Sequence, residues 1–262
     1  MNILMMGCGE MGFALLQSML LNKNIKAGSI TIVKPSPLKT KVKGVKVFNN
    51  IAALPKNYQP DLIIYAVKPV IVDDVAKETK HLLKKGGLAL SIAAGKTIAD
   101  FHKTFGKTTA VVRAMPNLPI SVGEGVTGLY AAKNVTAAQK KLCNELFKHS
   151  GLTLWLKTEA GINKIIAVAG SSTAYVYAFT IALEKAAVSY GFDSKLSAHI
   201  AGQVLRGAAA LLKESGLTPG QLNKSIATPG GSTQAALDTL AKGNALDKLV
   251  KKAADAAKNR FK

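Results

Sequence analysis

The first part of the chain alternates short apolar runs with stretches whose apolar residues repeat at helical spacing. The runs are continuous, which is typical of strands buried on both faces of a parallel sheet. Strands that alternate with helices along a chain predict a mostly parallel, doubly wound sheet. The strands are expected at residues 1–6, 29–33, 45–48, 61–67, 88–92, 109–113, 126–131 and 152–156.

Beyond Trp155 the sequence shows only helical periodicity. The stretch from Ile162 to Tyr190 contains no proline, and its one glycine is Gly170. If it is helical throughout, it spans roughly 40 Å. Its apolar residues lie all round the helix, which is the pattern of a buried helix. The helical sequence after residue 161 is too short to enclose such a helix, so we expect an obligate homodimer with intertwined helices.

Three helix starts carry capping boxes, in which two side chains three positions apart satisfy backbone donors at the helix start. They are Thr97 with Asp100, Thr136 with Gln139, and Thr218 with Gln221, the last with Pro219 at the first helical position. These helices are therefore expected to begin at defined residues.

A fourth helix start, within residues 228–237, is rich in glycine. Pro229 ends the preceding helix, because the residue before a proline avoids the α region. Gly230 and Gly231 let the backbone approach a ligand or take a positive φ. Ser232 or Thr233 is expected to cap the helix that follows. The free N–H groups of such a helix start suit a carboxylate or a phosphate.

The first apolar run leads into a glycine loop, Gly7-x-Gly9-x-x-Gly12, and then into a helical pattern. A strand, this motif and a helix in that order indicate a dinucleotide-binding site. Gly7 is expected to make the tight turn, Gly9 to let the pyrophosphate approach, and Gly12 to let the helix pack on the strand. Cys8 is interpreted as a small residue that fills the loop.

The chain is therefore predicted to be α/β with two domains. Residues 1–157 form an N-terminal, doubly wound Rossmann-type domain that binds NADP. Residues 158–262 form an all-α C-terminal domain for dimerisation and substrate binding.

The second predicted strand ends in Lys34, where NAD-preferring enzymes place an acidic residue for the ribose 2′-hydroxyl. No acidic residue occurs from Met11 to Pro60, and that window is rich in lysine. A carboxylate would repel a 2′-phosphate, whereas a lysine and a hydroxyl attract it. We therefore expect NADP(H) to be preferred and NAD(H) to be possible, with Lys34 and Ser36 as the contacts.

Composition narrows the function classes. The net charge is +20, but aromatics are only 6% and are not interleaved with basic residues, so no specific nucleic-acid binding is expected. Two cysteines form no disulfide framework, and four scattered histidines show no metal-ligand spacing. No uninterrupted apolar run reaches the roughly 18 residues of a membrane span, and no signal peptide has room before the first strand. A cytoplasmic protein without a metal site or membrane contact is expected.

Six sequence blocks resemble, in order and spacing, those of the pyrroline-5-carboxylate reductase family. The resemblance covers essentially the whole chain, and the last two blocks, with the long helix between them, are specific. The blocks are Gly7-x-Gly9-x-Met11-Gly12, Ala66-Val67-Lys68-Pro69, Ala93-Ala94-Gly95, Arg113-x-Met115-Pro116-Asn117-x-Pro119, Val122-Gly123-Glu124-Gly125 and Pro229-Gly230-Gly231-x-Thr233.

The resemblance implies reduction of 1-pyrroline-5-carboxylate to L-proline, the last step of proline biosynthesis, with NADPH or NADH. It also implies a site built between two subunits, in dimers that often assemble into a ring of five. Thr233 would be catalytic, with its hydroxyl near the ring nitrogen. The substrate carboxylate would lie at Gly230, Gly231, Ser232 and Thr233. The cofactor would contact Gly7, Cys8, Gly9, Glu10, Met11, Gly12, Lys34, Ser36, Asn50, Val67, Lys68, Pro69, Ala94 and Gly95.

The chain departs from the family pattern on the long helix. The family usually reads Ser-Gly-Ser-Gly-Pro-Ala-Tyr there, whereas this chain has Ser172 and Thr173 in place of the last glycine and the proline. Those two residues bend or break the helix in the family. We expect either a straighter helix here or hydroxyl groups that replace the lost contacts.

Two other functions fit part of the pattern. A β-hydroxyacid dehydrogenase shares the glycine loop and a helical second domain, but it needs a lysine acid in a Gly-x-x-x-Lys-x-x-x-Asn pattern that is missing around Lys164. A non-catalytic dinucleotide-sensing dimer could bind an acidic partner through its lysines. The intact Pro-Gly-Gly-x-Thr block argues against that reading.

Overall fold

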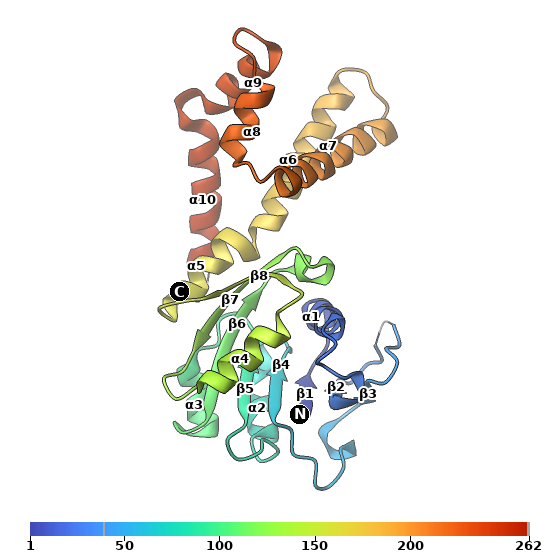
Figure 1. Cartoon of the computed structure of the whole chain (residues 1–262), viewed down its shortest axis with the longest axis vertical. Helices are drawn as coiled ribbons and strands as arrows, with labels where there is room; N and C mark the ends of the chain where they lie inside the picture. Colours follow the sequence, from blue (N-terminus) through green and yellow to red (C-terminus); the bar gives the residue numbers. More distant parts are fainter. Residues whose placement is uncertain (39, 261–262) are drawn as a thin grey trace. The chain divides into compact units, whose positions relative to one another are not determined.

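A computed structural model describes residues 1–38 and 40–260 of the chain. It contains two compact units: Met1–Ser171 together with the C-terminal residues from Ala257, and Ser172–Ala256. The first unit continues beyond residue 157, because helix α5 (Ala160–Ile165) packs against the sheet at strands β6 and β7. The eight strands with helices α1 to α5 belong to the first unit, and helices α6 to α9 belong to the second (Figure 1).

The first unit is built on one sheet of eight strands within the described residues. Their spatial order is β3-β2-β1-β4-β5-β6-β7-β8, parallel from β3 to β6, with β7 antiparallel to β6. This order confirms the predicted doubly wound sheet. The strands are β1 (Ile3–Met6), β2 (Ile30–Val33), β3 (Lys46–Phe48), β4 (Leu62–Tyr65), β5 (Leu88–Ser91), β6 (Ala110–Pro116), β7 (Gly125–Ala131) and β8 (Gly151–Trp155).

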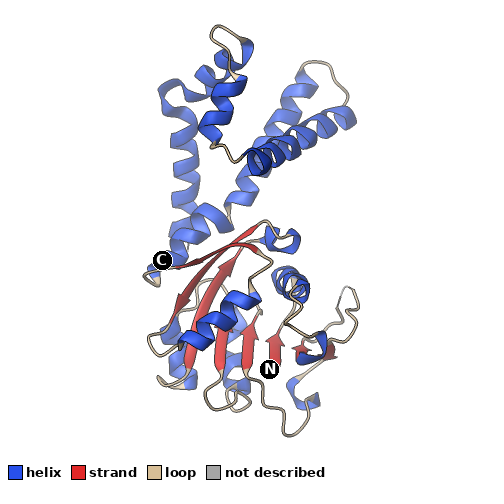
Figure 2. Ribbon diagram, viewed as in Figure 1, coloured by secondary structure: helices blue, strands red, loops and turns tan. Residues whose placement is uncertain are grey.

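The central strands form the core because their side chains are apolar on both faces. Every residue of β1, β2, β4 and β5 is buried. Helix α1 packs beside α4 and α2 packs beside α3, and the two pairs cover opposite faces of the sheet (Figure 2). Those helices are α1 (Glu10–Leu21), α2 (Val72–Thr79), α3 (Ile98–Phe105) and α4 (Ala137–Leu146).

Short 3-10 turns complete the connections of this unit. They are η1 (Ala27–Ser29), η2 (Ile51–Ala53), η3 (Pro69–Ile71) and η4 (Leu118–Val122). The capping boxes of Thr97 and Thr136 are both present, at the starts of α3 and α4. The sequence therefore located these two helix starts correctly.

The long helix predicted from Ile162 is interrupted. After α5 the chain makes a π-helical turn, η5 (Ile166–Gly170), in which the Ser171 N–H donates to the Ile166 carbonyl at 2.9 Å. Helix α6 begins only at Ser172. The predicted stretch is therefore helical but is not α-helical throughout. The interruption lies directly before the two residues that replace the family's glycine and proline.

A buried asparagine holds the π-helical turn. Asn117 donates from Nδ2 to the Ala169 carbonyl at 3.1 Å and accepts the Val126 N–H on Oδ1 at 2.7 Å. A single side chain thereby ties the turn to β7. π-helical turns are frequent at functional sites. The hydrogen bond from Asn117 explains an interruption of the α-helix that the neighbouring residues in the sequence do not predict.

The second unit is entirely helical in its described residues. Its elements are α6 (Ser172–Ser189), α7 (Ser194–Ser215), α8 (Pro219–Ile226), α9 (Ser232–Ala241), η6 (Lys242–Asn244) and α10 (Ala245–Asn259), the last extending just beyond the unit. The Asp193 side chain caps α7, and the capping box of Thr218, with Pro219 at the first helical position, starts α8 as predicted. Within the unit α6 packs along α7.

Large apolar side chains stay exposed on α6. Val176, Phe179 and Ile181 are 46%, 47% and 50% exposed. The helical stretch Ala160–Ser189 has a mean hydropathy of 1.5 over its most apolar window, of which 22% is buried. By length and composition alone this helix could cross a membrane, although polar residues interrupt its apolar runs. The apolar side chains of this helix need a covering surface, because the described residues of one chain leave most of them exposed.

Candidate active site

The glycine loop after β1 confirms the role predicted for Gly7. Gly7 has φ +81°, a conformation that side chains disfavour. A Cβ placed on it would lie 2.6 Å from Val67 Cγ1 and 2.8 Å from the Ala66 carbonyl oxygen. Its N–H donates to the Val33 carbonyl at 2.8 Å. Only glycine fits this turn between β1, β2 and β4.

The other two glycines differ in what surrounds them. A Cβ on Gly9 would meet nothing within 4 Å, whereas one on Gly12 would lie 3.1 Å from Ala66 Cβ. Gly12 therefore packs α1 against the end of β4, and Gly9 leaves open space at the helix start. Gly9 is also the N-cap of α1 and supplies no side-chain acceptor. The first N–H groups of α1, from Glu10 and Met11 onward, are suited to an anion.

A small cleft of about 80 Å³ joins this helix start to the end of β2. It is lined by Cys8, Gly9, Glu10, Phe13 and Lys34. Burial raises the pKa of the Cys8 thiol to about 11, and the nearby Lys34 ammonium opposes the shift. The thiol is therefore neutral at pH 7, which fits the packing role predicted for Cys8.

Lys34 and Ser36 lie where β2 leaves the sheet. The Lys34 N–H donates to the Phe48 carbonyl at 3.0 Å, and its Nζ donates to the Pro37 carbonyl at 3.0 Å. Ser36 is exposed on the same loop. An ammonium group has three donors, so Lys34 can hold Pro37 and still donate to an anion beside the glycine loop.

The predicted cofactor residues follow the carboxyl ends of five neighbouring strands. In spatial order β3, β2, β1, β4 and β5, these ends lead to Asn50, to Lys34 with Ser36, to the glycine loop, to residues 67–69, and to residues 94–95 (Figure 1). Ligands of such sheets bind at this edge, where the strand order reverses. Here the reversal falls between β1 and β4, beside Gly7.

The residues that follow β3 and those that follow β4 differ in their local structure. After β3, Asn50 caps η2 by accepting the Ala53 N–H on Oδ1 at 2.9 Å. After β4, Val67 is half-buried beside Gly7, while Lys68 and Pro69 are exposed at the start of η3. Asn50 therefore belongs to a capped turn, whereas Lys68 and Pro69 lie on an exposed loop.

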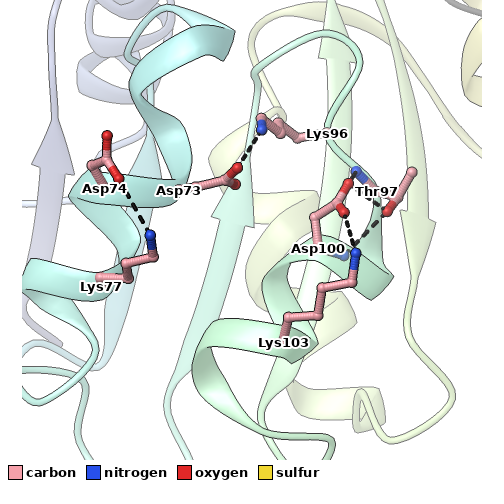
Figure 3. Close-up of polar contacts among 7 residues, drawn as sticks. All are labelled: Asp73, Asp74, Lys77, Lys96, Thr97, Asp100 and Lys103. Carbon is pink, nitrogen blue, oxygen red and sulfur yellow. Dashed lines mark hydrogen bonds and ion pairs between the residues drawn. The ribbon is translucent and has the colours of Figure 1, made fainter.

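The loop from Ala93 to Thr97 carries Ala94 and Gly95 and is fixed at several points. Gly95 has φ +78°. Lys96 Nζ forms an ion pair with Asp73 Oδ2 of α2 at 2.6 Å. Thr97 closes the capping box of α3, in which Asp100 Oδ2 accepts from its N–H and hydroxyl (Figure 3). The loop is thus attached to both flanking helices.

The substrate-loop residues belong to the helical unit, and there one expectation is wrong. The cap of α9 is Gly231, not Ser232 or Thr233, which are its first two helical residues. A Cβ on Gly231 would lie 2.6 Å from Thr228 Oγ1, so the turn excludes a side chain there. Gly230 has φ +75° and open space around it. Without a side-chain cap, the N–H groups of this helix start remain suited to an anion.

The sequence reasoning missed one polar pair, which lies in the first unit near the loop Ala93–Thr97. Arg113 in β6 is only 4% exposed, and its Nη1 donates to Glu159 Oε1 at 2.9 Å. A charged residue inside an apolar strand was the available signal, because buried charges are paired. Its partner comes from 46 positions further along the chain, which local patterns do not reveal.

Comparison with known proteins matches both parts of the chain. Residues 159–262 match the family described as pyrroline-5-carboxylate reductase dimerisation, and residues 2–95 match NADP oxidoreductase coenzyme F420-dependent. Pyrroline-5-carboxylate reductase 3 of Danio rerio is 34% identical over 90% of this chain and 82% of its own length. This chain belongs to the pyrroline-5-carboxylate reductase family.

Other members of the reductase family support the same assignment. The pyrroline-5-carboxylate reductase of Escherichia coli (strain K12) is 33% identical over 89% of this chain and 87% of its own. The crystal structure of Plasmodium falciparum pyrroline carboxylate reductase with NADP bound superposes with a TM-score of 0.85, at 30% identity, over 99% of this chain and 96% of that one. The chain is therefore an oxidoreductase with the two-part fold of this family.

Proposed function

We propose that the chain reduces 1-pyrroline-5-carboxylate to L-proline with NAD(P)H, the last step of proline biosynthesis. The observation that carries this proposal is the space around the glycines of the loop Gly7–Gly12, in a chain that belongs to the reductase family. A Cβ would collide with its neighbours at Gly7, would lie tightly against Ala66 at Gly12, and would find open space at Gly9. The residues present therefore fit a dinucleotide along the start of α1.

The remaining groups fit the reaction. Reduced nicotinamide supplies hydride when bound, and residues 67–69 with 94–95 would border that end. The free N–H groups at the start of α9 would hold the substrate carboxylate. Thr233, in the first turn of α9, would place its hydroxyl near the ring nitrogen. A protonated cyclic imine is already an electrophile, so orientation is the main requirement and no strong acid is needed.

NADP(H) is the proposed preference over NAD(H). Lys34 lines the cleft beside Gly9, and no acidic residue occurs between Met11 and Pro60. The kcat/KM ratio of NADPH to NADH tests this. Lys34→Glu should lower the ratio about tenfold or more, because a carboxylate repels the 2′-phosphate. Lys56→Glu, in the same basic window, is the control and should leave the ratio unchanged.

We propose a cytoplasmic homodimer, with the active site built between two subunits and dimers able to form a ring of five. The match to a dimerisation family supports homo-oligomers. The exposed apolar side chains of α6 supply a surface for a partner. Light scattering on the purified protein distinguishes a dimer from a ring of ten chains.

The deciding experiment is NADPH oxidation by the purified protein with 1-pyrroline-5-carboxylate, repeated with NADH. Turnover is the expected result. A folded oligomer that binds NADPH and yet shows no turnover with either cofactor would contradict the proposal. In that case Ser172 and Thr173 would have moved the chain to another substrate.

A further inference from the structure

Arg113 brings a buried positive charge to the carboxyl edge of the sheet. In β6 it pairs in register with Ser91, the last residue of β5. Its guanidinium is paired with Glu159, whose side chain is 30% exposed at the start of α5. Because an unpaired buried charge is costly, this pair fixes the Glu159 carboxylate beside the loop that follows β5.

The same carboxylate oxygen has a second partner. Glu159 Oε1 accepts the Ile98 N–H at 2.8 Å, across 61 positions of sequence. Ile98 is the first residue of α3, so its N–H has no acceptor within the helix. The capping box of Thr97 serves the neighbouring donors and not this one. Glu159 therefore completes the start of α3.

This contact supplies a third attachment for the loop Ala93–Thr97. The ion pair of Lys96 with Asp73 attaches the loop to α2, and the box of Thr97 with Asp100 attaches it to α3 (Figure 3). Glu159 then connects the start of α3 to β6 and α5. We infer that Glu159 is a positioning residue that holds this loop in place for hydride transfer.

The inference rests on the proposed function, because Ala94 and Gly95 border the nicotinamide end only if the cofactor binds there. It predicts that removing Glu159 displaces the loop Ala93–Thr97 even in protein that still folds. Glu159 lines an open groove of about 660 Å³ with Ile98, His102 and Tyr130. Water can therefore occupy the space left by Glu159→Ala. Mobile water would not fix the Ile98 N–H.

The test compares Glu159→Ala, Glu159→Gln and a control, Asp61→Ala. Asp61 also accepts one backbone N–H, from Asn2 at 2.8 Å, and one cation, Lys84 at 3.2 Å, but it precedes β4 at the opposite edge of the sheet. The control therefore loses similar contacts away from the loop. Glutamine keeps an oxygen that can accept from Ile98 and should restore function.

In Glu159→Ala, kcat should fall about tenfold to a hundredfold, the range expected when reacting groups are misplaced. KM for 1-pyrroline-5-carboxylate should change less than about twofold, because the substrate loop is untouched. Hydrogen exchange of the Ile98 amide in the cofactor-free protein should become faster. Glu159→Gln and Asp61→Ala should keep kcat and the Ile98 exchange rate near those of the wild type.

If Glu159→Ala does not fold, the double variant Arg113→Met with Glu159→Ala removes the unpaired charge as well and should show the same fall in kcat. Equal kcat values for folded Glu159→Ala and Asp61→Ala would overturn the inference. A fall in kcat for Glu159→Ala with unchanged Ile98 exchange would also overturn it. Wild-type protein that neither binds NADPH nor turns over would instead overturn the proposed function, and this inference with it.

Discussion

The two compact units of this chain differ in whether they close their own core. In the first unit, four central strands are fully buried between helices that cover both faces of the sheet. In the helical unit, Ser197 and Ala201 are the only buried residues among those described. The first unit can thus hold the glycine loop in place by its own packing. The helical unit needs another surface to cover its apolar side chains.

The difference follows from geometry. A parallel sheet with helices on both faces encloses its strands within one chain. A pair of helices such as α6 and α7 encloses only the line along which they touch. The apolar residues on the remaining faces of α6 must be covered from outside. The comparison therefore predicts that the two units respond differently to substitution.

The largest effect should come from charging the exposed face of α6. Phe179→Glu with Ile181→Glu should give inactive monomers, because two unpaired carboxylates would be buried in the interface. The first unit should still fold and bind NADPH. Sedimentation velocity and NADPH binding measure both effects. Lys141→Glu, an exposed charge reversal on α4, is the control, and double-variant dimers of unchanged stability would refute the comparison.

Within the cofactor unit, two glycine variants should separate folding from binding. Gly7→Ala should lower the free energy of unfolding by about 1–3 kcal/mol through backbone strain alone, and by more through the collision with Val67. It should also abolish measurable NADPH binding. Gly9→Ala should unfold at nearly the wild-type temperature, because nothing lies within 4 Å of its Cβ, yet bind NADPH more weakly. Thermal melts and titration calorimetry check this pair. Equal destabilisation would show that the loop is not a cradle.

In the helical unit, Thr233→Ala should lower turnover about a hundredfold, the usual effect of removing one well-placed donor. NADPH affinity should hardly change, because the cofactor residues lie in the other unit. Thr239→Ala on the same helix is the matched control, since its hydroxyl donates to the Ala235 carbonyl of that helix at 2.9 Å. Equal losses of turnover and cofactor affinity in Thr233→Ala would refute the role of this hydroxyl.

The smallest effect concerns acid stability. Hydrogen bonds from Thr97, backbone first and then side chain, lower the pKa of Asp100. A carboxyl group whose pKa is lower in the folded state than in the unfolded state stabilises the fold at pH values above its unfolded pKa of about 3.9. This stabilisation is lost as the pH falls from that value through the folded-state pKa. Asp100→Asn should therefore show a smaller fall in urea midpoint between pH 7 and pH 3 than the wild type. Asp74→Asn on α2 is the control and should keep the wild-type fall.

Sequence alone determined the features that depend on neighbours in the chain. The order of strands and helices, the capping boxes at Thr97, Thr136 and Thr218, and the turn at Gly7 all follow from local residue chemistry. The order of the predicted cofactor residues also followed, because each comes directly after a strand whose place in a doubly wound sheet is fixed by topology.

Tertiary structure decided what depends on residues far apart in the sequence. The π-helical turn at Ile166–Gly170 is held by Asn117, and the start of α3 is completed by Glu159. The pairing of Arg113 with Glu159 likewise joins residues 46 positions apart. Packing and long-range hydrogen bonds select among several conformations that the local sequence permits, so these features needed the folded chain.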